Sequence, residues 1–221
     1  MTNTTEASTS PLTDPRPAFA RAVDIATGVI ESVLPEQLEL PTPCDQMNVA
    51  GLLSHLVMVP DRVARAGRGD DSSTWPIAGP SLTPGEWAPA FRAAAADAVA
   101  EWDADDALLA RMTALPWTSI PGAAVVGIYT NEVLVHAWDL AVAIGADVDW
   151  DEAALTVASA AMHEELPDAD RDPMWAAMAE HLPEGMEWAP PFVNAVDVAD
   201  EATPIERLVA WSGRSPAWSA E

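Results

Sequence analysis

Hydrophobic residues recur every three or four positions along several long stretches of the chain. In the first stretch, residues 17–34, the apolar positions include Phe19, Val23 and Ile30. This spacing predicts amphipathic helices, because an α-helix turns once every 3.6 residues. Four long helices are predicted, over residues 17–34, 48–67, 84–111 and 122–144. Shorter helices are predicted over residues 151–165, 173–181 and 204–213.

Turn-forming residues separate these stretches. Asp45 or Asn48 can cap the second helix, and Gly145 can end the fourth. Residues 67–84 are rich in Gly, Asp, Ser and Pro and predict a loop, whose Trp75 either folds over a site mouth or covers the core. Residues 188–198 are expected to be extended or irregular. No strong strand alternation is found.

The pattern therefore predicts a mainly all-α protein. We expect a disordered tail over residues 1–14, a four-helix bundle over 15–145, and a helical extension over 146–221 that packs on the bundle and is partly irregular.

Two of the long helices carry residues that can ligate a metal. Glu132 and His136 are four positions apart, so their side chains lie on one helix face. His55 stands in an apolar run of the other helix, Leu52-Leu53-Ser54-His55-Leu56-Val57. Two imidazoles and one carboxylate make a three-ligand site for a divalent ion, with a coordination position left open.

Simpler interpretations exist for each residue. Glu132 and His136 could be a solvated pair on a helix surface, and His55 could be a core histidine bonded to a carbonyl group. The remaining histidines, His163 and His181, stand in acid-rich surroundings and are expected to be solvated.

The charge of the chain excludes some partners. The formal net charge is −25, and all ten basic residues are arginine. Residues 146–206 contain sixteen acidic residues and one basic residue, Arg171. Such a surface repels phosphate backbones and anionic lipids, so we expect no nucleic acid and no membrane among its partners. The large negative charge is interpreted as a feature that keeps the protein in solution.

Cys44 is the single cysteine, so no intramolecular disulfide can form. The absence of disulfides fits a reducing compartment. The N-terminus does not have the pattern of a signal peptide, and the chain has no apolar run long enough to span a membrane. A cytoplasmic location is therefore expected. Cys44 precedes His55 by eleven residues, about 16 Å along a helix axis, which is too far for shared ligation unless the chain folds back. It is interpreted as a small structural residue near a helix start, with a reactive thiol as the alternative.

Three segments resemble one protein family. They are Pro41-Thr42-Pro43-Cys44-Asp45 through His55-Leu56-Val57, the run Glu132-Val133-Leu134-Val135-His136-Ala137-Trp138-Asp139-Leu140-Ala141, and the tail from Ala202 to Trp218. Together they are similar to actinobacterial DinB-like proteins and to the N-terminal, metal-binding domain of mycothiol-dependent maleylpyruvate isomerase. The resemblance covers the chain from about residue 17 to its end.

The resemblance implies a DinB-like four-helix bundle in which His55, Glu132 and His136 bind a divalent ion, expected to be zinc, with nickel as an alternative. Asp139 would accept a ring N–H from a ligand histidine or hold a metal-bound water, and it is the candidate catalytic residue. Its simpler interpretation is an acid on the helix surface. The chain departs from the family at Met47, where tryptophan is frequent. It also has a short, acidic region in place of the isomerase's separate C-terminal domain, so that particular isomerisation is not implied.

The leading functional prediction is a metal-dependent transferase or isomerase that uses a low-molecular-weight thiol such as mycothiol. A metal-bound thiol ionises near neutral pH and attacks an electrophilic small molecule without a protein nucleophile. One alternative is a non-catalytic metal-binding bundle that acts as a sensor or interaction module; another is attack by metal-activated water. Arg62 and Arg65 are candidates for a substrate clamp, or else solvated arginines. A monomer and a homodimer both remain open.

Overall fold

The computed structural model describes residues 14–180, 190 and 192–219. The predicted disordered tail over residues 1–14 lies outside this part of the chain, except for Asp14. The elements are α1 (Arg16–Ser32), η1 (Pro35–Gln37), α2 (Val49–Arg68), η2 (Ser72–Thr74), α3 (Trp87–Asp103), η3 (Asp106–Leu109), β1 (Met112–Ala114), β2 (Ser119–Pro121), α4 (Gly122–Ile144), α5 (Glu152–Glu165), α6 (Arg171–Ala179) and α7 (Pro204–Trp211).

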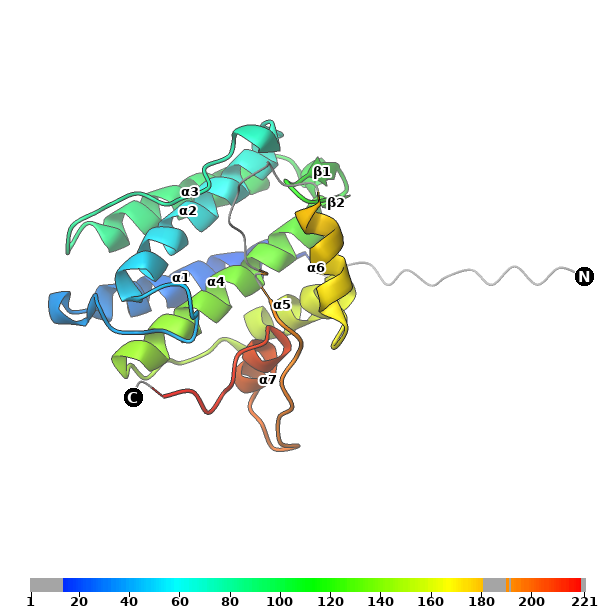
Figure 1. Cartoon of the computed structure of the whole chain (residues 1–221). Coiled ribbons are helices and arrows are strands. Elements are labelled where there is room, and N and C mark those ends of the chain that lie inside the picture. The colour runs from blue at the N-terminus through cyan, green and yellow to red at the C-terminus, as the bar shows by residue number, and fades with distance from the viewer. Residues whose placement is uncertain (1–13, 181–189, 191, 220–221) are drawn as a thin grey trace, which may run out of the picture.

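The first four α-helices form a bundle, as the hydrophobic pattern predicted. Helix α2 packs along α3, α1 packs along α4, and the two pairs lie against each other (Figure 1). Each helix turns its apolar residues inward, and one continuous cluster of buried side chains runs through the bundle. The mainly helical bundle predicted from the sequence is confirmed.

Helix α4 is the central element of the molecule. It contacts α1, α2, α5 and α7, and buried residues occur on every side of it. A Cβ atom on Gly127 would lie 2.8 Å from the Cβ of Ala161, so the glycine lets α4 and α5 approach closely. A helix enclosed in this way can present polar side chains to the interior, where their geometry is fixed by packing.

Capping groups set the ends of several helices. The Asn48 side chain accepts a hydrogen bond from the Gly51 N–H at 2.9 Å, so Asn48 rather than Asp45 caps α2. Gly145 adopts a left-handed conformation directly after α4, as predicted. Thr203 and Glu206 form a capping box at the start of α7.

The prediction of one helix over residues 84–111 was wrong at both ends. Helix α3 spans Trp87–Asp103, and a 3₁₀ turn and strand β1 follow it. The Asp105 side chain accepts a hydrogen bond from the Ala107 N–H at 2.8 Å, which starts the separate turn η3. Arg111 then donates to the carbonyl groups of Ala66 and Gly67 at the end of α2. These contacts direct the chain into a short antiparallel hairpin, β1–β2, which the sequence did not predict.

The loop between α2 and α3 lies along α2. Arg62 donates two hydrogen bonds to the Pro76 carbonyl, at 2.7 and 3.2 Å, and the Ser54 hydroxyl donates to the Pro80 carbonyl at 2.9 Å. A Cβ atom on Gly79 would lie only 1.9 Å from the Ser54 carbonyl oxygen, so the loop backbone touches the helix there. Trp75 is buried in the core cluster, which supports the second of its two interpretations.

The segment between α1 and α2 folds back on itself. Pro41 and Asn48 form an isolated antiparallel bridge, and the N–H groups of Val49 and Ala50 donate to the Leu40 and Leu38 carbonyls. This fold returns residues 42–47 to the start of α2, beside the bundle, instead of extending them away from it.

The C-terminal part of the chain packs on the bundle through α5 and α7. Helix α5 contacts α1 and α4, and α7 contacts α5 and α4. A smaller buried cluster, Met162, Leu166, Trp175 and Phe192, joins α5, α6 and the segment that follows. Residues 190 and 192–198 contain no helix or strand, as predicted, whereas residues 188, 189 and 191 lie outside the described residues.

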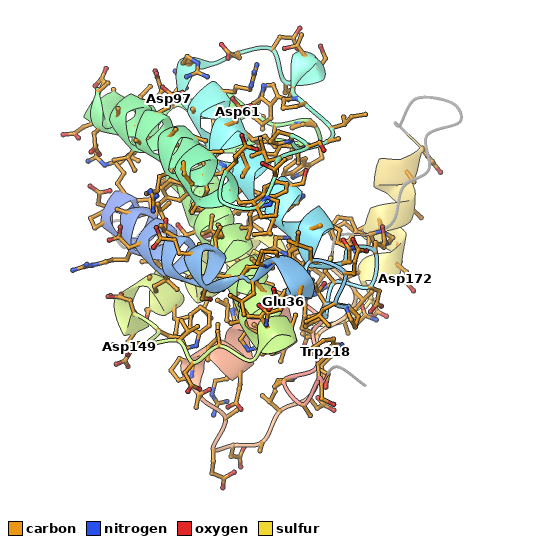
Figure 2. All side chains as sticks on the ribbon, turned by 90° about the vertical axis from the view of Figure 1, so that its left-hand side faces the viewer. Glu36, Asp61, Asp97, Asp149, Asp172 and Trp218 are labelled. Atoms are coloured by element: carbon orange, nitrogen blue, oxygen red, sulfur yellow. The ribbon has the colours of Figure 1, made fainter. Side chains whose placement is uncertain are left out.

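Acidic side chains are spread over the surface. In Figure 2, Asp61 on α2 and Asp97 on α3 lie at the top of the view, and Asp149, in the loop between α4 and α5, lies at the lower left. Among the described residues, none of the helices has the length and apolar character that crossing a membrane requires.

Candidate metal centre

His55, Glu132 and His136 meet between helices α2 and α4. The His55 Nε2 atom lies 3.0 Å from Glu132 Oε1, and His136 Nε2 lies 3.4 Å from the same oxygen. One potential ligand atom from each residue falls within 4.8 Å of the other two. Glu132 and His136 are stacked one helical turn apart, as their spacing predicted, and His55 comes from the neighbouring helix.

The three residues are exposed to different degrees. The side chains of His55 and Glu132 are each 21% exposed, whereas that of His136 is 7% exposed. The two imidazole rings meet edge to face, with centroids 4.7 Å apart and an angle of 75° between their planes. Solvent therefore reaches the cluster from the side of His55 and Glu132, while His136 closes its inner side.

Asp139 lies behind His136. Its Oδ2 atom is 3.0 Å from His136 Nδ1, and the carboxylate is completely buried. The interpretation of Asp139 as an acid on the helix surface is therefore wrong. A carboxylate at Nδ1 keeps that nitrogen protonated, so Nε2 is the nitrogen that faces Glu132 and that could bind a metal once it has lost its own proton. Asp139 touches no ligand position directly, so its geometry is that of a positioning residue.

The ionisation of the cluster follows from its hydrogen bonds. Burial alone would raise the pKa of Glu132, but its hydrogen bonds with His136 and His55 outweigh burial and hold that pKa well below its usual range. Burial likewise disfavours protonated His136, but hydrogen bonds with Asp139 and Glu132 raise its pKa to about 9. Burial lowers the pKa of His55. A proton on His136 thus compensates the buried carboxylates when no cation is bound.

The donor set suits a zinc ion. Two imidazole nitrogens and one carboxylate oxygen are common ligands of zinc sites that keep a position open. Ligand atoms at about 2.1 Å from a tetrahedral ion lie roughly 3.4 Å from one another. The separations of 3.0 and 3.4 Å between the two His Nε2 atoms and Glu132 Oε1 are close to that spacing. The residues therefore fit such an ion with small side-chain adjustments.

Cys44 lies closer to the cluster than the sequence indicated. The folded-back segment brings its sulfur within 4.8 Å of ligand atoms of both His136 and Asp139. The chain thus folds back, which is the case in which Cys44 was expected to come near the ligands, and the expectation that no protein nucleophile lies nearby was wrong. Burial raises the pKa of the Cys44 thiol, so the cysteine is held in its neutral form.

Sequence reasoning missed the role of Arg214. Its Nη2 atom lies 3.4 Å from Asp139 Oδ2, and its Nη1 atom donates to the Ser212 carbonyl at 3.0 Å. Gly213, in a left-handed conformation with a φ of 83°, makes the turn between α7 and this arginine. The tail motif contains Trp211-Ser212-Gly213-Arg214, but only the folded chain shows that the arginine reaches Asp139.

Within the described part of the chain, the other candidate residues do not contribute ligand atoms to this cluster. His163 is exposed and stacks on Trp211, with ring centroids 3.7 Å apart, and His181 is outside the described residues. Arg65 forms an ion pair with Asp61 at 2.7 Å, on the surface of α2. Arg62 instead anchors the loop at Pro76 and is half-buried.

Two cavities of about 290 and 270 Å³ lie away from the trio. The first is lined by residues of α1, α3 and α4, including Arg16 and Trp102, and the second lies at the end of α1 beside Trp87. Neither is lined by any of the three candidate ligands. A substrate at the trio would therefore bind on its exposed side, against α2 and the loop that covers it.

Comparison with known proteins adds to this geometry. Residues 19–141 match the model of the mycothiol maleylpyruvate isomerase N-terminal domain, a range that contains the trio and Asp139. Two curated proteins of Mycobacterium tuberculosis, "Uncharacterized protein MT0763" of strain CDC 1551 and "Uncharacterized protein Rv0738" of strain H37Rv, are each 31% identical over 202 residues. The alignments cover 91% of this chain and 98% of each relative. No solved structure matches the chain significantly.

Proposed function

The chain belongs to the mycothiol maleylpyruvate isomerase N-terminal domain family, and from this membership and its site we propose a metal-dependent enzyme that uses a low-molecular-weight thiol. His55, Glu132 and His136 would hold a divalent ion, with zinc as the favoured metal. The observation that carries the proposal is the one-sided exposure of the trio, in which His136 is buried and His55 and Glu132 are partly exposed.

A bound zinc ion would lower the pKa of a thiol at its open position and so supply a thiolate near neutral pH. The chain's own residues set up that position. Asp139 orients His136 through Nδ1, and Glu132 offers the negative charge that favours a divalent cation. The natural thiol in this proposal is mycothiol, and the second substrate is an electrophilic small molecule, so the reaction is a transfer or an isomerisation.

A non-catalytic metal-binding module is the second candidate. It is favoured by the position of the two cavities, neither of which reaches the trio. In such a module the metal would stabilise the contact between α2 and α4, and any partner would recognise the surface around it.

Cobalt substitution separates these candidates. Cobalt(II) occupies zinc sites and reports its ligands through visible absorption, and a bound thiolate adds a charge-transfer band in the near ultraviolet. We expect that band when mycothiol, or N-acetylcysteine as a simpler probe, is added to the cobalt-loaded protein. Cys44→Ser serves as the control, because it removes the protein's own thiol from the vicinity of the site.

A cobalt spectrum that no thiol alters would contradict thiol use and favour the metal-binding module. Hydrolysis of an ester by the zinc-loaded protein without added thiol would instead point to metal-activated water.

A further inference from the structure

A buried hydroxyl lies one helical turn from the candidate metal ligands. Tyr129 precedes Glu132 by three residues on α4, so the two side chains share a helix face. The Tyr129 side chain is buried, and its hydroxyl has no hydrogen-bond partner among the described residues. An unpaired buried hydroxyl is unfavourable, so a hydrogen-bond acceptor bound beside Tyr129 would be stabilised by it.

Arg62 offers a cation on the facing helix. It follows His55 by seven residues, two turns of α2, and therefore lies on the same side of that helix. Its Nε and Nη2 atoms donate to the Pro76 carbonyl. Within the described part of this highly acidic chain no carboxylate forms an ion pair with Arg62, whereas Arg65 and Arg68 on the same helix both have carboxylate partners.

The two groups act on each other across the contact between α2 and α4. Burial raises the pKa of Tyr129 above its usual value, the positive charge of Arg62 opposes that rise, and the charge of Glu132 adds to it. The phenol therefore stays protonated and can donate a hydrogen bond.

We propose that Tyr129 and Arg62 form an anion-binding subsite beside the metal position, which takes a carboxylate group of the electrophilic substrate. The assignment of that carboxylate to the electrophile rests on the function proposed above. A carboxylate accepts hydrogen bonds from a phenol and from a guanidinium at the same time, and the bond to the guanidinium is charge-assisted. Bound there, it would hold the rest of the substrate next to a thiol on the metal.

A metal ion on the trio should strengthen anion binding at the subsite. A divalent cation held by Glu132 and the two histidines would add positive charge one turn from Tyr129 and so attract an anion there. We therefore expect anions to bind to both forms of the protein, and more tightly to the zinc-loaded form.

Arginine side-chain NMR can test the subsite without any reaction. The chain contains ten arginines and no lysine, so the Nε–Hε signals form a small set that single variants can assign. The probe is benzoate, and benzamide is the uncharged control of similar shape. We expect benzoate to shift the Arg62 signal saturably, in the metal-free and in the zinc-loaded protein, and benzamide to leave it unchanged.

Two variants and a control locate the binding site. Arg62→Gln should weaken benzoate binding about tenfold or more, because it removes a charge-assisted contact. Tyr129→Phe should weaken it about three- to tenfold while keeping the ring in the core. Arg65→Gln, which changes a neighbouring arginine already paired with Asp61, should bind benzoate like the wild type.

An Arg62 signal that does not respond, or an equal response to benzamide, would overturn the subsite. Full benzoate affinity in folded Tyr129→Phe, or equal losses in Arg62→Gln and Arg65→Gln, would also overturn it. These outcomes are independent of the function proposed above: a protein that binds no zinc but shows the specific Arg62 shift keeps the subsite and loses the metal chemistry.

Discussion

Asp139 illustrates how one buried side chain fixes the geometry of a site. It lies on α4 three residues after His136, accepts a hydrogen bond from Nδ1–H of that histidine, and is itself held by Arg214 from the C-terminal tail. A ligand histidine must present Nε2 without a proton to a metal, and the carboxylate at Nδ1 selects that tautomer. Asp139 is therefore placed to orient His136 for a metal without itself being one of the three candidate ligands.

We predict that Asp139→Asn weakens zinc binding about 10- to 100-fold, the usual effect of losing an outer-shell partner of a ligand histidine. The amide can donate a hydrogen bond to Nδ1 and so favour the wrong tautomer. Competition with a chromophoric zinc chelator measures the change. Asp149→Asn, at an exposed acid, is the control, and equal affinities for the two variants would show that Asp139 does not position His136.

The metal-free protein should lose stability as the pH rises above neutrality. In the folded chain the pKa of His136 is raised to about 9 from an ordinary value of 6.5, so folding favours its protonated form. The stabilisation is complete below about pH 6.5 and is lost as the pH rises through about 9. Urea unfolding of chelator-treated protein measures it. His136→Gln should flatten this dependence; an unchanged slope in that variant would assign the effect to another group.

Helices that end at strong local signals were predicted most accurately. Helix α4 begins after Pro121 and ends at Gly145, and its predicted bounds, 122–144, agree with the structure. The run of alanines in α3 gave no comparable signal at its C-terminal end, so the predicted helix continued through Asp105. The hairpin β1–β2 has only three residues per strand, too few for an alternating pattern to be recognised.

The loop over α2 depends on a glycine at its closest approach. A methyl group at position 79 would lie 1.9 Å from the Ser54 carbonyl oxygen, next to His55. We predict that Gly79→Ala moves the loop and destabilises the protein by about 1–3 kcal/mol, the usual cost of an added methyl group in a packed region. Thermal or urea unfolding measures the change in free energy.

Gly28→Ala is the matched control, because nothing lies within 4 Å of a Cβ atom there. Inside α1 it should stabilise the protein by about 0.5–1 kcal/mol, since alanine favours a helix more than glycine does. A Gly79→Ala variant as stable as Gly28→Ala would show that the loop does not press on α2.

At the scale of the whole molecule, the site gathers residues from distant parts of the chain. The spacing of Glu132 and His136 and the apolar setting of His55 indicated the trio from the sequence. Cys44 and Arg214 could not be placed in the same way, because a folded-back loop and a C-terminal turn bring them to Asp139. The spacing of residues in the sequence shows which side chains share a face of one helix. The contacts of Cys44 and Arg214 depend instead on how loops pack.

The acidic surface should make stability depend on salt. With a formal net charge of −25, like charges repel across the folded molecule, and added ions screen that repulsion. We predict that added sodium chloride raises the melting temperature of the protein at pH 7 by several degrees. The increase should be smaller at pH 5, nearer the sequence isoelectric point of about 4.1. An equal salt effect at both pH values would contradict this explanation.

Metal content tests the central claim most directly. Plasma mass spectrometry of the purified protein, offered zinc and then desalted, should find about one zinc ion per chain in the wild type. His136→Ala should lose that ion, and His163→Ala, which changes the exposed histidine stacked on Trp211, should keep it. A wild-type protein that stays empty when offered zinc or nickel, or a His136→Ala variant that keeps the full amount, would contradict the account.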